Sequence, residues 1–202
     1  YKKQYKNDII KNSAKNISVN FYYKPNSPTI VKKRFVDEIN KNKILGVYEI
    51  NDELINKNEQ RNIEKKLHRI IGKVDHVIVS DYGHGFISEK TAQYITRVYK
   101  SVSLSAQLNA ANLGMHTINK YKKIETVVIN EMELRQEMKD RNTPIKNLMK
   151  KLTQRIKLQN LIVTRGINGS ILYDKNNKKF IECPAFASSV VDKVGAGDSM
   201  LS

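Results

Sequence analysis

Short apolar segments that alternate with amphipathic helical patterns constrain most strongly what this chain can fold into. The apolar segments are 74–80, 102–105, 126–129 and 160–164, the helical patterns between them cover about 89–100, 131–139 and 144–157, and a hairpin-like region follows at 169–182. Segment 74–80 is nearly continuous in its apolar residues, as expected of a strand that is buried on both faces. Buried strands that alternate with helices predict an α/β fold, in which helices sandwich a parallel sheet.

The N-terminal part of the chain has a different pattern. Residues 1–20 are polar and lysine-rich, which predicts a helix or a poorly ordered lead-in. Residues 21–55 contain β-type runs that are separated by prolines and by Asn/Lys turns. These runs are 21–23, 29–31 and 44–50. We therefore expect a single domain over 1–202, with a small strand-rich subdomain at 21–55 and an α/β core over 59–202.

Polar or glycine-rich clusters follow the predicted strands, and one more lies near the C-terminus. The clusters are Ser80-Asp81-Tyr82-Gly83-His84-Gly85, Asn130-Glu131-Met132-Glu133, Thr164-Arg165-Gly166-Ile167-Asn168-Gly169 and Asp192-Lys193-Val194-Gly195-Ala196-Gly197-Asp198. In open α/β sheets, ligands bind beyond the carboxyl ends of the strands. Each cluster alone is a weak signal, but four of them on one edge of a sheet predict a site.

The C-terminal cluster suggests a specific chemistry. The run Gly195-Ala196-Gly197 is small enough for the backbone to approach a ligand closely. If a helix begins at Asp198, its free N–H groups face the same point and make an anion hole. A carboxylate there can accept the proton of a sugar hydroxyl while the amides hold the oxygens of a phosphoryl group in transfer. The alternative is that Asp198 only caps a helix after a glycine turn.

The net charge of the chain raises the question of nucleic acid. A charge of +16 and a pI near 9.8 are the usual footprint of a nucleic-acid-binding protein. The excess is mostly lysine, with 28 Lys against 8 Arg, and it is scattered along the chain. Because bidentate reading of bases and phosphates favours arginine, we do not expect a nucleic-acid partner. A basic surface that attracts phosphorylated small molecules accounts for the charge equally well.

Cysteine use, hydropathy and histidine spacing bear on the compartment, the membrane and metal binding. Cys183 is the single cysteine, which excludes an internal disulfide and indicates a reducing cytoplasm. No apolar run approaches the ~20 residues that span a bilayer, so we expect no membrane partner. The histidines His68, His76 and His116 lack the spacing of metal ligands, and we expect them to be structural.

The C-terminal cluster, preceded along the chain by Asn-x-x-Glu and Thr-Arg-Gly, resembles the ribokinase/PfkB family of carbohydrate kinases in content and order. The resemblance covers essentially all of residues 21–202. It implies a ribokinase-like fold and phosphoryl transfer from ATP, with Mg²⁺, to a hydroxyl of a sugar or sugar phosphate. It also implies the following roles: Asp198 as catalytic base, the amides of Gly195, Ala196 and Gly197 as anion hole, Asn130 and Glu133 as residues that order Mg²⁺ and phosphate largely through water, and Thr164, Arg165, Gly166 and Gly169 as the lining of the nucleotide phosphate and ribose.

Within that family, the chain is most similar to the kinase domains that act on heptose phosphates in nucleotide-heptose synthesis. The cluster at 80–85 is similar to their Ser-Asp-Tyr-x-Lys-Gly, and residues 28–34 with the strand at 44–50 resemble their β lid. This likeness implies a sugar side formed by Asp81, Arg34 and Asn109. It also makes the lid a candidate homodimer surface and a fused nucleotidyltransferase domain a candidate partner.

Several residues keep two interpretations, and some depart from the family pattern. Asp81 is either an acceptor for a substrate hydroxyl or a turn former. Lys193 stands where the family has Thr, and His84 stands where the heptose kinases have Lys, so His84 is either a loop histidine or a phosphate contact. Domains of the family are longer, so we expect N- and C-terminal parts to be missing here and the chain alone to be inactive. The rival hypothesis is a catalytically silent kinase-like domain that serves as a binding or assembly module.

Overall fold

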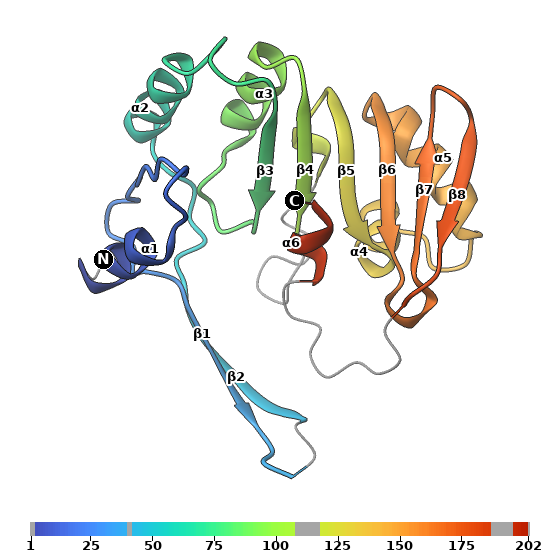
Figure 1. Ribbon diagram of the computed structural model, residues 1–202, viewed down its shortest axis with the longest axis horizontal. Coiled ribbons are helices and arrows are strands. Elements are labelled where there is room, and N and C mark those ends of the chain that lie inside the picture. The colour runs from blue at the N-terminus through green and yellow to red at the C-terminus, as the bar shows by residue number, and fades with distance from the viewer. Residues whose placement is uncertain (1–2, 40–41, 108–117, 187–195, 202) are drawn as a thin grey trace.

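A six-stranded sheet forms the centre of the computed structural model, which describes residues 3–39, 42–107, 118–186 and 196–201 (Figure 1). The strands lie side by side in the order in which they occur along the chain. They are β3 (Val77–Asp81), β4 (Val102–Ala106), β5 (Ile124–Asn130), β6 (Leu158–Thr164), β7 (Ser170–Asp174) and β8 (Lys179–Cys183). Strands β3 to β6 are parallel, and β7 and β8 add to them as an antiparallel hairpin. The predicted α/β class with a mostly parallel sheet is confirmed.

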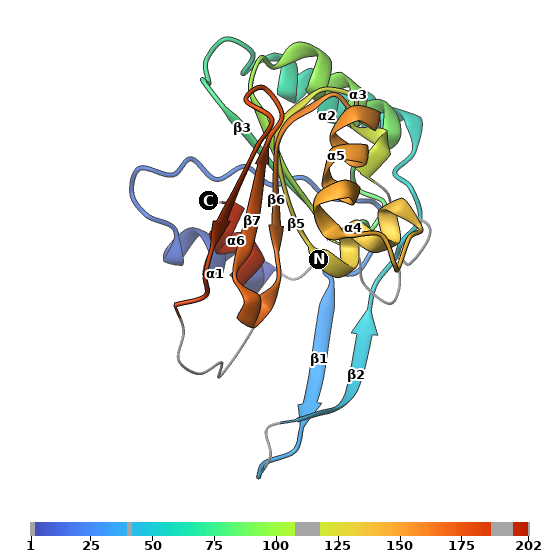
Figure 2. The same cartoon turned by 90° about the vertical axis from the view of Figure 1, so that its right-hand side faces the viewer.

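One face of the sheet is apolar and carries the core. A row of residues in register crosses all six strands on this face: Val79, Leu104, Val127, Leu161, Tyr173 and Phe180. The helices that cover it are α2 (Lys57–His68), α3 (Glu89–Val98), α4 (Glu131–Met138) and α5 (Ile145–Arg155) (Figure 2). Their buried side chains, such as Ile95, Leu134 and Leu152, join the strand residues in one hydrophobic cluster. Burial of this apolar area is the main favourable term in folding.

The opposite face is more polar and more sparsely covered. Its register rows alternate with the core rows, and one of them reads Ile78, Ser103, Thr126, Asn160, Asp174 and Lys179. Helix α6 (Ala196–Leu201) contacts β4 and β5 on this side (Figure 2). Helices therefore flank the sheet on both faces, as predicted, but the two layers are unequal in the described part of the chain. The remaining short elements are α1 (Lys3–Asn12) and the 3₁₀ turns η1 (Ile118–Lys120) and η2 (Gly166–Asn168).

Side-chain caps fix where several helices begin. The Asn56 side chain accepts hydrogen bonds from the backbone at Asn58 and Glu59 at the start of α2. Ser88 accepts from the Thr91 amide at 3.1 Å at the start of α3. Because the first N–H groups of a helix have no partner within it, such caps typically contribute about 1 kcal/mol each. Among the described residues, no helix has the length and apolar character needed to cross a membrane.

An antiparallel hairpin, β1 (Val31–Val36) and β2 (Lys43–Glu49), projects from the body of the molecule (Figure 1). Its β2 corresponds to the run predicted at 44–50, whereas β1 begins at Val31, the last residue of the run predicted at 29–31. The third run, 21–23, does not form a strand. Its Tyr22 ring instead packs edge-on against Phe86, with ring centroids 5.9 Å apart, and its hydroxyl lies near Glu59. Aromatic residues suit strands and tertiary packing equally, which is why the pattern misled there.

Candidate active site

The carboxyl ends of the four parallel strands meet at one edge of the sheet. Asp81 ends β3, Asn130 ends β5 and Thr164 ends β6, and Asn130 lies directly beside Thr164 in the register. Helix α6 and the hairpin lie toward this same edge (Figure 1). The structure thus brings together three of the four sequence clusters as strand ends, and the fourth through α6.

Helix α6 carries the small-residue run and the predicted base. It begins at Ala196, two positions before the predicted start, so that Gly197 and Asp198 lie in its first turn. A Cβ atom added to Gly197 would meet nothing within 4 Å among the described residues. Glycine costs a helix about 1 kcal/mol relative to alanine, so neither packing nor helix stability explains this residue. A glycine here leaves the backbone open to close approach by a ligand.

Asn130 and Glu133 form a reciprocal capping box at the start of α4. The Glu133 amide donates to Asn130 Oδ1 at 2.8 Å, and the Asn130 amide donates to Glu133 Oε2 at 2.8 Å. Two N–H groups that would lack partners are satisfied in this way. The Asn-x-x-Glu motif therefore has a structural role in addition to the one that the resemblance implies. The two oxygen-bearing side chains are also of the type that Mg²⁺ prefers, directly or through water.

Two glycines shape the loop after β6, and each position requires glycine for a different physical reason. Gly166 has φ +58° and open space around it, so its backbone conformation alone favours glycine. At Gly169, φ is +74° and an added Cβ would lie 2.0 Å from the Cys183 carbonyl oxygen, so any larger side chain would clash with β8. Arg165 Nε lies 3.6 Å from Glu131 Oε2 and makes no hydrogen bond within the described residues. The Arg165 guanidinium thus stands between two strand-end clusters.

Asp81 is buried in a polar cluster that sequence reasoning missed. Its Oδ2 accepts from the Tyr121 hydroxyl at 2.7 Å and pairs with Lys120 Nζ at 2.6 Å. Its Oδ1 accepts from the Gly83 amide at 3.0 Å, which is the turn-forming role considered above. Burial, and then the Asp81 charge, raise the pKa of Tyr121. Because Lys120 and Tyr121 lie about 40 residues along the chain in no periodic pattern, no sequence signal pointed to them.

The hairpin presents two faces of different character. Lys32, Arg34 and Tyr48 alternate onto one face, and the Tyr48 ring lies over Gly46 beside Lys43. Lys43 Nζ donates to the Tyr48 hydroxyl at 3.0 Å and lowers the pKa of Tyr48, with smaller effects from Arg34 and Lys32. The other face exposes the apolar side chains Phe35, Leu45 and Val47, with Lys33 paired beside Val47.

The basic face of the hairpin is the one that turns toward the strand ends. Lys32 Nζ lies over the Tyr82 ring, 5.9 Å from its centroid, and Tyr82 directly follows β3. Tyr82 is 42% exposed, so a ligand between hairpin and sheet could reach it. Arg34 shares the face of Lys32, as the strand alternation predicted.

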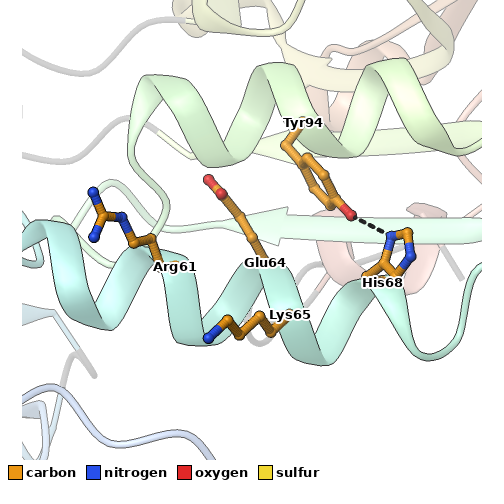
Figure 3. Close-up of a pocket in the computed structure, with 5 residues that line it drawn as sticks. All are labelled: Arg61, Glu64, Lys65, His68 and Tyr94. Carbon is orange, nitrogen blue, oxygen red and sulfur yellow. Dashed lines mark hydrogen bonds between the residues drawn. The ribbon is translucent and has the colours of Figure 1, made fainter.

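Some predicted site residues fall outside the described part of the chain. Asn109 and Gly195 lie there, as do Asp192 and Lys193. Within the described residues, no group of three His, Cys, Asp or Glu side chains could hold a metal ion directly. A shallow pocket between α2 and α3 is lined by Arg61, Glu64, Lys65, His68 and Tyr94 (Figure 3). None of these residues belongs to a strand-end cluster, so this pocket is not part of the candidate site.

The family of the chain follows from comparison with known proteins. A family model described as "pfkB family carbohydrate kinase" matches residues 2–202. The chain belongs to this family. Two curated relatives of this pfkB-family chain are both named bifunctional protein HldE. The protein of Aliarcobacter butzleri is 28% identical over 151 residues, and that of Campylobacter fetus is 30% identical over 142 residues.

The matches also define how much of a relative the chain represents. It aligns over 73% and 69% of its own length with these two HldE proteins but covers only 30% of each of them. Among solved structures, the ribokinase of Arabidopsis thaliana complexed with ribose and ATP has a TM-score of 0.59 and 20% identity. That alignment covers 86% of this chain and 54% of the ribokinase. The predicted ribokinase-like fold and the family resemblance are therefore both confirmed.

Proposed function

We propose that the protein to which this chain belongs transfers the γ-phosphoryl group of ATP to a hydroxyl of a phosphorylated sugar. The observation that carries this proposal is the position of α6. It brings Gly197 and Asp198, the end of the family signature, to β4 and β5 at the carboxyl edge of the sheet. The membership in a carbohydrate kinase family supports the reaction class. The ATP of the similar ribokinase supports the choice of nucleotide.

The residues of the chain have distinct tasks in this reaction. Asp198 takes the proton of the attacking hydroxyl, so that the oxygen becomes a better nucleophile as its bond to phosphorus forms. The amides of Gly195, Ala196 and Gly197 donate to the oxygens of the phosphoryl group in flight. Thr164, Arg165 and Gly166, with Gly169, line the nucleotide. Asn130 and Glu133 would hold a Mg²⁺ ion through water, and the ion would supply neutralisation of the phosphate charge.

The basic face of the hairpin supports a phosphorylated acceptor such as a heptose phosphate. Lys32 and Arg34 share a face with Tyr48, and Lys32 reaches over Tyr82 beside the strand ends. A phosphate needs several charge-assisted donors, and a guanidinium provides two in one plane. The oxygens of Asp81 bind Tyr121, Lys120 and Gly83. Asp81 therefore acts on the sugar side by holding the strand-end loop in place. Asn109 remains a proposed sugar contact.

The relatives also suggest partners. Both curated relatives are named bifunctional and are much longer than this chain, which motivates a nucleotidyltransferase domain in the same protein. The exposed apolar face of the hairpin motivates a homodimer, because apolar strand faces are stabilised when a partner covers them.

The central test is Asp198→Asn in the full-length protein. The amide keeps the shape of the carboxylate but cannot accept the proton, so turnover should fall about 10²–10⁴-fold. Binding of ATP, measured by calorimetry, should persist. Near wild-type release of ADP in a coupled assay would refute the assignment of Asp198, and total loss of ATP binding would indicate a folding defect instead.

The acceptor is tested by Arg34→Ala, with Lys33→Ala as the matched control. Lys33 is the neighbouring cation on the opposite face of β1. Arg34→Ala should lower kcat/KM for a sugar phosphate by about 10-fold or more, since a charge-assisted contact is lost, and should leave the free sugar nearly unchanged. Lys33→Ala should affect neither substrate. Equal losses on both substrates, or equal effects of the two variants, would remove Arg34 as a phosphate contact.

A further inference from the structure

The hairpin is joined to the body of the molecule at its root. The chain enters β1 through residues 24–26 and leaves β2 through residues 51–55, and both segments lie against the loop that follows β3. Lys24 Nζ donates to the Asn51 carbonyl oxygen at 2.7 Å and approaches the His84 carbonyl oxygen at 3.5 Å. The two segments of the root are thus hydrogen-bonded to each other and to the strand-end loop.

His84 makes the central side-chain contact of this root. Its Nδ1 lies 2.7 Å from Asp52 Oδ1, and the His84 side chain is only 4% exposed, whereas that of Asp52 is 39% exposed. Its Nε2 is buried and has no hydrogen-bond partner in the described part of the chain. The hydrogen bonding of the imidazole therefore rests on Asp52, and this contact selects the tautomer and the orientation of the ring.

The backbone around His84 is equally constrained. The Ile55 amide donates to the Gly85 carbonyl oxygen at 3.1 Å. Gly85 has φ +75°, and an added Cβ would lie 2.0 Å from the Glu53 carbonyl oxygen. Only glycine allows the loop to approach residues 52–53 so closely. The position of His84 opposite Asp52 is therefore set by the chain on both sides of it.

We propose that His84, held by Asp52, is a positioning residue that fixes the root of the hairpin to the strand-end loop and so keeps Lys32 and Arg34 over the site. This inference rests on the proposed function for its consequence in catalysis. It assigns His84 a different role from phosphate contact, because the ring is buried and its Nδ1 already pairs with Asp52. Lys32 lies over the ring of Tyr82 in the same strand-end loop that the root contacts, so the root helps to set where the basic face lies.

Hydrogen–deuterium exchange of the full-length protein tests the contact directly. His84→Ala and Asp52→Ala should speed amide exchange in residues 22–26 and 51–55 by about tenfold, the loss expected for one partly buried charge-assisted hydrogen bond. Asp52→Asn keeps Oδ1 as an acceptor and should restore near wild-type exchange. His68→Ala is the matched control, because it removes a histidine that bonds Tyr94 between α2 and α3 (Figure 3).

Steady-state kinetics of the same variants test the positioning role. The two alanine variants should raise KM for the sugar phosphate about tenfold and leave kcat and the KM for ATP close to wild type, since the hairpin carries sugar-side contacts only. Unchanged exchange at the root, exchange equally raised by His68→Ala, or an unchanged sugar KM would each overturn the inference. If the wild-type protein phosphorylates no sugar, the proposed function fails, and the exchange arm still decides whether His84 holds the root.

Discussion

At the scale of single residues, the candidate site uses side chains that also stabilise the fold. Glu133 caps α4 through Asn130 and stands at the edge where the nucleotide phosphates are proposed to bind. Gly197 shows the reverse case, because packing among the described residues does not require it. Separating stability from ligand binding is therefore the way to learn what each residue does.

Glu133→Gln should separate the two roles of the capping box. Glutamine can serve in a capping box, so the free energy of unfolding should change little. The carboxylate charge beside the proposed Mg²⁺ position is lost, so the affinity for ATP with Mg²⁺ should fall about 10-fold or more. Calorimetric titrations of wild type and variant, each with and without Mg²⁺, decide the matter. Equal affinity in all four titrations would leave Glu133 with its helix-capping role only.

Gly197→Ala should give the opposite combination. The free energy of unfolding should stay constant or rise by at most about 1 kcal/mol, since alanine favours the helix. Turnover should nevertheless fall at least about tenfold, because the methyl group would enter the space where we propose that the phosphoryl group approaches the backbone. Denaturant titration and a coupled ADP assay on the same preparation provide the two readings. A variant that is both stable and fully active would mean that no ligand approaches this backbone closely.

At the scale of elements, buried polar contacts hold η1 and α4 in place around the site. Asp81 binds Lys120 and Tyr121 at the end of η1. Glu137 on α4 accepts from the Ile118 amide at 3.2 Å and pairs with Arg155 on α5. Burial raises the pKa of Glu137, although the Ile118, Arg155 and Asn119 contacts oppose that effect. These polar contacts fix the positions of η1, α4 and α5 relative to one another more specifically than apolar packing does.

The pKa of Glu137 leads to a pH-dependent difference in stability. Because its pKa is raised above its usual 4.5, the folded state binds the proton more readily than the unfolded state. This contribution to stability is fully present below pH 4.5 and is lost as the pH rises through the raised value. Relative to wild type, Glu137→Gln should therefore become more stable as the pH rises. Denaturant unfolding of both full-length proteins, from below pH 4.5 upward, measures the difference in their free energies of unfolding. A difference that does not vary with pH would contradict the prediction.

At the scale of the whole molecule, the hairpin is a thin element with two faces of different character. Its basic face turns to the strand ends, and its apolar face, with Phe35 53% and Leu45 54% exposed, turns away. An isolated two-stranded hairpin is at best marginally stable in water. Cover from a second copy of the chain would stabilise the element and hold its basic face in one geometry.

Val47→Lys should weaken self-association of the full-length protein. A charge on the apolar face would be desolvated in the dimer, and one such residue typically costs at least about 2 kcal/mol, or roughly 30-fold in the dimer dissociation constant. Ile70→Lys is the matched control, since Ile70 is a similarly exposed β-branched residue that follows α2. Sedimentation velocity over a range of concentrations measures both. A wild-type protein that stays monomeric at high concentration would refute the proposed homodimer.

Patterns of short range predicted most of this fold, and contacts of long range escaped prediction. The strands, the helices and the edge on which the site lies follow from periodicity and from the polar clusters after each strand. The pairs His84–Asp52 and Asp81–Tyr121 join residues 32 and 40 positions apart, and nothing in the spacing of either pair marks it. The turn at Asp81 was one of the two interpretations that the sequence offered for this residue, and its partner, Gly83, is only two residues away. Tertiary packing decided the rest.

The six strands of the sheet lie in the order in which the ribosome makes them, β3 first and β8 last. Among the six described strands, each therefore adds to an edge formed by the one before it. Neighbouring strands are close in the chain, and the longest connection between them holds the two helices α4 and α5, so each pairing closes a fairly short loop and loses little chain entropy. The sheet can grow from one side as the nascent chain emerges, and its parallel pairs, slow to form between distant segments, arise here between strands that were synthesised moments apart.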